Sequence, residues 1–87
     1  MAHMRLSPDF EHVYNAIMTE LRGYIHGSEC HMDKIKEWLS TLPPEGVNSL
    51  LEQLRRNLET WKNIGSITEE QYEKALQKLE EIRDLAK

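Results

Sequence analysis

Three side chains that could ligate a metal or carry a nucleophile lie close together in the sequence, at His26, Cys30 and His31. A structural zinc site needs about four Cys or His ligands in a tetrahedral array. The spacing H-x3-C-H is not typical of such a site, and Gly27 interrupts the helical relation between His26 and Cys30. We therefore expect no metal ligands, and a metal-binding module at these three residues is the third interpretation of the function.

A cysteine nucleophile is the second chemistry that this region suggests. Cys30 is expected at the second position of a helix capped by Ser28, where the positive helix terminus favours a thiolate. No Asp or Asn that would complete a Cys–His catalytic group is evident. The adjacent carboxylates at 69–70 and 80–81 do not face each other on a helix, so they do not suit acid–base catalysis. We expect no catalytic residues, no cofactor and no small-molecule substrate, and predict that the chain is not an enzyme.

Two adjacent arginines, Arg55 and Arg56, followed by Trp61 could contact nucleic acid. Glu52 and Glu59 flank the arginines, and side chains three or four positions apart are neighbours on a helix. The formal net charge is −4, and no basic tail or acidic block stands out. We therefore interpret the arginines as part of a salt-bridged solvent face and expect no nucleic-acid partner. A small nucleic-acid-associated regulator is the alternative function.

The elements that must position these side chains are four amphipathic helices. Apolar residues recur at intervals of three and four in four segments, which prolines, glycines and capping residues separate. The predicted helices span residues 8–26, 29–41, 45–64 and 69–86. Because all three connections are short, neighbouring helices must run antiparallel. The sequence therefore predicts an all-α fold, an antiparallel up-down bundle of four helices, with two hairpins that complete a core by dimerising as the alternative.

Residues with known preferences for helix ends set these boundaries. Ser7 is the expected N-cap of the first helix, and Gly27 its expected end. Thr68 and Gln71 have the spacing of a capping box, in which each side chain accepts a hydrogen bond from the other residue's backbone. Gly65 supplies the left-handed residue that ends the preceding helix. We therefore expect the C-terminal half to be a helical hairpin.

Length and composition indicate a single small domain. Residues 1–4, Met-Ala-His-Met, have the character of a vector remnant, and residues 5–87 are expected to form one helical domain. The single cysteine, Cys30, excludes an intrachain disulfide and fits a reducing compartment. No apolar run approaches the roughly 20 residues that span a bilayer. We therefore expect a small acidic cytoplasmic protein with no membrane partner.

A family pattern is recognisable in residues 61–82. It combines a turn glycine, an Ile-Thr-Glu-Glu helix start with an aromatic residue, and Lys and Leu at helical spacing, here Gly65, Ile67, Thr68, Glu69, Glu70, Tyr72, Lys74, Lys78 and Leu79. This stretch, about a quarter of the chain, resembles the short C-terminal domain called SHOCT. The resemblance implies a small helical hairpin that mediates oligomerisation or protein contacts and has no catalytic residues. The longer third helix and the residues upstream depart from the family pattern.

Four apolar side chains at the margins of the helical stripes are candidates for contact with a partner: Trp38, Met18, Tyr24 and Met32. Aromatic residues and Met are enriched in interfaces, although they also fill gaps in small cores. We therefore predict a small helical-bundle protein–protein interaction module, an adaptor or regulator. It would bind a protein partner or a second copy through apolar anchors on the first two helices.

Overall fold

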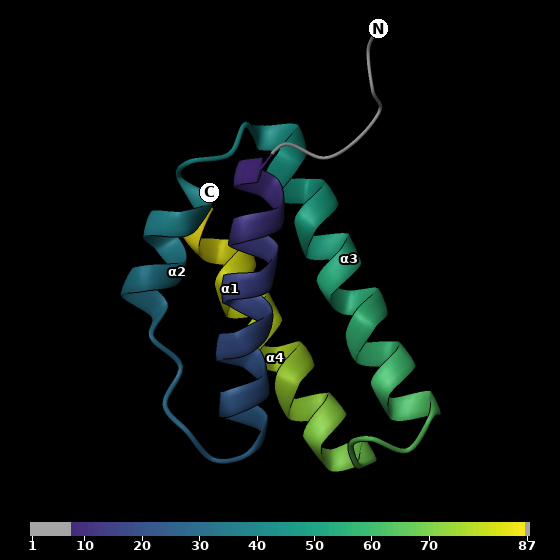
Figure 1. Ribbon diagram of the computed structural model, residues 1–87. Helices are drawn as coiled ribbons and strands as arrows, with labels where there is room; N and C mark the ends of the chain where they lie inside the picture. The colour runs from purple at the N-terminus through teal and green to yellow at the C-terminus, as the bar shows by residue number, and fades with distance from the viewer. Residues whose placement is uncertain (1–7, 87) are drawn as a thin grey trace, which may run out of the picture.

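The computed structural model describes residues 8–86, which form four α-helices and no strand. They are α1 (Pro8–Ile25), α2 (Met32–Leu39), α3 (Pro44–Asn63) and α4 (Glu69–Leu85). Successive helices run antiparallel, so that α1 and α3 begin at the end where α2 and α4 finish (Figure 1). We call this the apical end. The predicted all-α, up-down bundle of four helices is confirmed.

Two expectations concern the N-terminus and fall outside the described residues. They are the capping role of Ser7 and the vector remnant at residues 1–4. At the other end of α1 the helix stops one residue before the predicted position, and the bounds of α3 and α4 also agree with the prediction to within one residue. None of the described helices combines the length and the apolar character that a membrane crossing requires.

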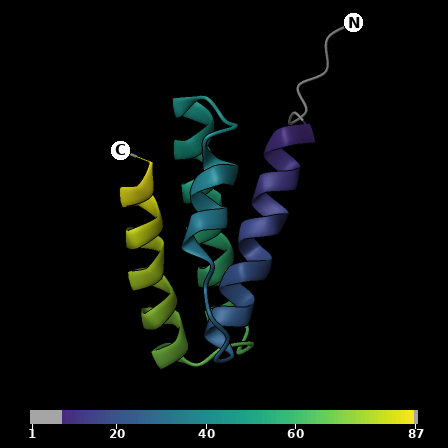
Figure 2. The same cartoon turned by 90° about the vertical axis from the view of Figure 1, so that its left-hand side faces the viewer.

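The three long helices form the body of the bundle, and the short α2 packs against α1 and α4. Figure 2 shows α2 in front of the space between α1 and α4, with α3 behind it. Contact between α2 and α3 is weak. In a regular up-down bundle these two helices would be packed neighbours. The seam between α2 and α3 is therefore the open side of this bundle.

One apolar core joins all four helices. None of the described polar or charged side chains is buried. The buried side chains come from apolar positions at helical spacing and, at Ile67, from the connection before α4: Phe10, Val13, Ile17, Met18, Leu21, Ile25, Ile35, Leu39, Val47, Leu50, Leu51, Leu54, Leu58, Ile67, Ala75, Leu79 and Ile82. Since burial of apolar area is the main favourable term in folding, these residues hold the helices together.

Glycines end α1 and α3 as predicted. Gly27 has a φ of 101° and Gly65 a φ of 83°, both in the left-handed region that favours glycine. After α1, the Ser28 N–H donates to the Gly23 carbonyl at 2.8 Å, and an equivalent bond closes α3 around Gly65. These bonds pair carbonyls of the last helical turn, which lack the regular i+4 N–H partner of a helix. Both turns lie at the basal end of the bundle, opposite the apical end (Figure 1).

The second helix is shorter than predicted, and its predicted start at residue 29 is wrong. Ser28 does not cap α2, because its backbone takes part in the closure of α1. A carboxylate oxygen of Glu20 instead accepts a hydrogen bond from the His31 N–H at 3.1 Å, which holds the connection before Met32. At its other end α2 stops two residues earlier than predicted, where two hydroxyl side chains donate to helix carbonyls.

The capping box at the start of α4 is confirmed. Thr68 Oγ1 accepts a hydrogen bond from the Gln71 N–H at 3.0 Å, and Gln71 Oε1 accepts one from the Thr68 N–H at 2.8 Å. The Gln71 side-chain amide also lies 3.5 Å from the carbonyl oxygen of Ile25, the last residue of α1. One short turn therefore caps α4 and lies beside the end of α1.

Candidate docking groove

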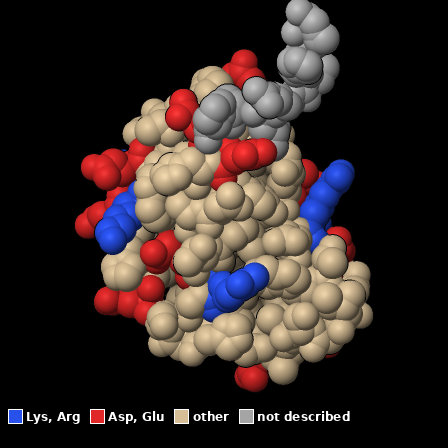
Figure 3. Space-filling model, in the orientation of Figure 1, with Lys and Arg blue, Asp and Glu red and all other residues tan. Residues whose placement is uncertain are grey.

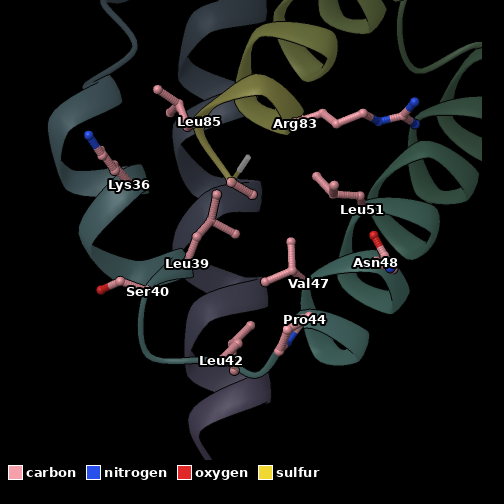
Figure 4. A pocket seen from close by; sticks show the side chains of 11 residues that line it. Lys36, Leu39, Ser40, Leu42, Pro44, Val47, Asn48, Leu51, Arg83 and Leu85 are labelled. Carbon is pink, nitrogen blue, oxygen red and sulfur yellow. The ribbon is translucent and has the colours of Figure 1, made fainter.

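The seam between α2 and α3 opens into a groove at the apical end, which we call the apical groove. Its volume is about 460 Å³. The described residues that line it divide into an apolar wall and a polar margin (Figure 4). The apolar wall consists of Leu39, Leu42, Pro44, Val47, Leu51, Leu85 and Ala86, and the polar margin of Lys36, Ser40, Asn48 and Arg83.

Three helices and one connection supply the apolar wall. Leu39, at the end of α2, and Val47 and Leu51, in the first turns of α3, are buried and form its floor. Leu42 and Leu85 are half-buried at the margin. Leu42 precedes a proline, which disfavours helical geometry and places this leucine in the connection between α2 and α3. A partner that covered Leu42 and Leu85 would remove further apolar surface from water.

Among the described residues that line the groove, both charged side chains are basic. Lys36 comes from α2 and Arg83 from α4. In Figure 4 Arg83 extends toward α3, whereas the Lys36 ammonium lies at the α2 margin and points outward. The Arg83 guanidinium is 3.8 Å from a carboxylate oxygen of Glu80. None of the ion pairs in the described part of the chain includes Lys36.

The four residues predicted for partner contact do not line the apical groove. Met18 is 8% exposed and belongs to the core. Trp38 and Met32 are half-buried and pack against that core. Tyr24 is half-buried on α1. We leave Met18 out of the proposed surface because so little of it is accessible, and partner contact by the other three stays a prediction.

The ring of Tyr24 is covered by cations of the same chain. Lys74 Nζ lies 5.1 Å and Lys78 Nζ 4.8 Å from the ring centroid. Burial opposes the charge of Lys78, but its hydrogen bond with Glu81 at 3.1 Å and the charge of that carboxylate outweigh this effect and raise the pKa of the ammonium. Cation–π contacts of this kind stabilise by about 0.5–1 kcal/mol at exposed sites. Tyr24 therefore already has partners within the domain.

His26, Cys30 and His31 have separate roles in the structure. His26 Nδ1 lies 2.8 Å from the Arg22 carbonyl oxygen, and His31 Nδ1 lies 3.0 Å from a Glu20 carboxylate oxygen. Cys30 is in the connection, so its predicted position inside a helix is wrong. Burial raises the pKa of its thiol, which disfavours the thiolate. Among residues 8–86, no group of three or more His, Cys, Asp or Glu side chains is arranged to hold a metal ion.

Glu20 anchors the connection before α2 to α1. Partial burial works against its charge, but hydrogen bonds from the backbone and ring of His31 and the charges of His31 and Lys34 outweigh that effect. Together they lower the pKa of the Glu20 carboxyl. The ionised carboxylate therefore stabilises the placement of the connection.

The arginines on α3 form the predicted salt-bridged face. Glu52 binds Arg55 at 2.7 Å and Arg56 at 3.3 Å. Trp61 is covered instead by the guanidinium of Arg22, 5.1 Å from the ring centroid. On the face shown in Figure 3, the basic side chains are separated from one another and form no continuous patch.

Sequence reasoning missed the apical groove. Two residues indicated apolar surface at this end of the bundle. Leu42 is an apolar residue in a connection bounded by proline, and Leu85 extends the last apolar stripe to the end of α4. Both lie at the same end of an up-down bundle. The opening between α2 and α3, however, depends on how α2 packs on α1 and α4, which no local pattern encodes.

No family model, no curated protein and no solved structure matches the chain. The resemblance of residues 61–82 to SHOCT is neither supported nor contradicted by this result and stays a prediction. The function is therefore inferred from the geometry and chemistry of the groove.

Proposed function

We propose that this chain is a protein–protein interaction module that holds apolar side chains of another polypeptide in the apical groove. The observation that carries the proposal is a largely apolar hollow of about 460 Å³ between three helices. This volume lies within the range of about 300–1,000 Å³ that pockets for small molecules have, which is enough to admit apolar side chains. A groove between two helices is also the shape that receives the apolar face of an amphipathic helix. The open seam between α2 and α3 suits such an occupant.

The driving force would be removal of apolar surface from water at the margin of the groove. Leu42 and Leu85 are half-buried in the free domain, and apolar burial contributes about 25 cal/mol for each Å² removed from water. Association and ordering of the partner segment oppose this gain. The apical groove is small compared with a standard interface, so we expect a transient complex with a Kd in roughly the micromolar range.

In this proposal the chain is an adaptor or regulator and performs no catalytic step of its own. We favour a partner protein over a second copy, because a formal charge of −4 on each copy opposes self-association. The single cysteine, Cys30, favours a cytoplasmic location. The resemblance to SHOCT implies the same class of role, contact with proteins.

A peptide selection tests this function. A library of random 16-residue peptides displayed on phage is selected on the wild-type chain, and enriched peptides are synthesised for Kd measurement by fluorescence anisotropy. Leu42→Gln and Leu85→Gln, which remove the apolar margin, are each expected to weaken binding about tenfold or more. Leu76→Gln is the matched control, a half-buried leucine of α4 outside the groove, and should change the Kd less than about twofold.

Two outcomes would contradict the proposed function. One is the absence of any enriched peptide from repeated selections. The other is a set of peptides that bind Leu42→Gln and Leu85→Gln as tightly as wild type. Circular dichroism of each variant shows whether its helices are intact, so a loss of binding through unfolding is recognised directly.

A further inference from the structure

We infer that the apical groove receives an acidic amphipathic helix, whose apolar side chains enter the groove and whose carboxylates pair with Lys36 and Arg83. This inference rests on the proposed function and adds the chemistry of the partner. It follows from the contrast between the charge of the whole chain and the charge of the groove.

The groove reverses the overall charge of the chain. The chain carries 15 Asp and Glu against 11 Lys and Arg. Among the described residues that line the groove, however, the only charged side chains are Lys36 and Arg83. The two come from different helices: Lys36 borders the groove on its α2 side, and Arg83, from α4, extends toward α3 (Figure 4). A segment with carboxylates beside its apolar face complements this arrangement.

Both cations are available to bind a carboxylate of a partner. The distance of 3.8 Å between Arg83 and Glu80 exceeds that of a hydrogen bond, and both side chains are more than half exposed. Such a pair contributes little, and a guanidinium can bind a better-placed carboxylate through two parallel hydrogen bonds. Lys36 takes part in no ion pair with the described residues. Its exposed ammonium sits on a long stem that can turn toward an occupant.

Helix-end preferences explain only part of this pattern. Lys36 and Arg83 each lie in the last turn of their helix, where a cation interacts favourably with the helix dipole. The same rule accounts for Glu45 in the first turn of α3, where it follows the groove residue Pro44 in the sequence. Glu45 does not line the groove, although its neighbours Pro44 and Val47 do. Among the described residues that line the groove, the charged side chains are therefore basic.

The charge of the selected peptides tests the inference. An overall acidic protein attracts basic peptides through non-specific electrostatics, so enrichment of acidic peptides would identify the groove as their site. Each enriched peptide is compared with a version in which Asn and Gln replace Asp and Glu. We expect the acidic version to bind about three- to tenfold more tightly at low salt. At about 0.5 M salt the difference should largely disappear.

Charge-removing variants locate the preference on the protein. Lys36→Gln and Arg83→Gln should each reduce the preference for the acidic peptide. Lys34→Gln and Arg56→Gln are the matched controls, because they remove the same charges from exposed positions of α2 and α3 outside the groove. The controls should leave the preference unchanged to within about twofold.

The outcomes separate this inference from the proposed function. If the enriched peptides are neutral or basic, or if Lys36→Gln and Arg83→Gln keep the acidic preference, the inference fails while the proposed function stands. If no peptide is enriched, both fail. Light scattering over a concentration series tests whether a second copy of the chain occupies the groove. A dimer that the Leu85→Gln substitution dissociates would place that copy in the groove and overturn the inference.

Discussion

Thr68→Ala tests how much the turn before α4 contributes to the stability of the bundle. The substitution removes Oγ1, which accepts the hydrogen bond from the Gln71 N–H at 3.0 Å. Loss of an N-cap side chain costs about 1 kcal/mol, within a range of about 0.5–2 kcal/mol. The hydrogen bond is exposed, so water can reach the unpaired Gln71 N–H, and we expect a value near 1 kcal/mol. For a domain of this size that corresponds to a fall in Tm of roughly 4–8 °C.

The reciprocal bond gives the prediction a second, independent measurement. Gln71→Ala removes the acceptor for the Thr68 N–H, 2.8 Å away, and should cost a similar amount. Because the two side chains form one capping box, the double variant should lose less than the sum of the single losses. We expect a coupling free energy of about 0.5 kcal/mol. The contact of Gln71 with the Ile25 carbonyl, at 3.5 Å, is too long to add much.

Urea unfolding followed by far-ultraviolet circular dichroism and by tryptophan fluorescence gives these free energies. Thr60→Ala is the matched control, because Thr60 is an exposed threonine inside α3, where Ala has the higher helix propensity. It should be neutral or slightly stabilising. If Thr68→Ala differed from this control by less than about 0.3 kcal/mol, the stabilising role assigned to the cap would be wrong.

Two further predictions concern the anchor of the connection before α2 and two glycines with different backbone conformations. Glu20→Gln keeps an acceptor oxygen but removes the charge, and should cost about 0.5 kcal/mol at neutral pH. Because folding lowers the pKa of Glu20 below its ordinary 4.5, this contribution is present above that pH and is lost as the pH falls through the folded-state pKa. Urea unfolding of both proteins across this range measures it, and a difference that stayed constant down to about pH 2 would contradict it. Gly65→Ala should destabilise by about 1 kcal/mol through its left-handed backbone alone, since an added Cβ meets no atom within 4 Å. Gly23→Ala, inside α1 with ordinary contacts to the Ser28 side chain at 3.5 and 3.8 Å, should stabilise by up to about 1 kcal/mol. Thermal melts that gave both variants the same sign would refute this explanation.

Helix ends were predictable where the deciding interactions are local. Thr68 and Gln71 bond to each other's backbone across three positions, and Gly27 and Gly65 each close the helix that precedes them. The start of α2 was not predictable in this way. Ser28 suits an N-cap by residue type, but its backbone is used by α1, and the connection is held by a carboxylate eleven residues earlier in the chain.

The candidate site shows the same limit at the level of packing. Helical spacing places Met18 and Trp38 at the margins of their stripes, yet Met18 is buried and Trp38 only half-buried. The difference depends on which neighbouring helix covers each margin: Asn57 of α3 donates to Met18 Sδ at 3.7 Å, whereas Trp38 lies on α2, which packs mainly on α1 and α4. The same packing opens the seam in which Leu42 and Leu85 lie. The two leucines can be identified in the sequence, but the groove between them depends on tertiary packing and cannot.

The even number of antiparallel helices brings Pro8 and Ala86 to the same end of the bundle as the apical groove (Figure 1). A fusion partner, affinity tag or surface tether attached near either residue would therefore stand beside the groove and obstruct its occupant. Ser66, in the exposed turn at the opposite end, is the better attachment point. A dye or biotin on Ser66→Cys, in a Cys30→Ser background, leaves the groove accessible to the peptides that are to be measured.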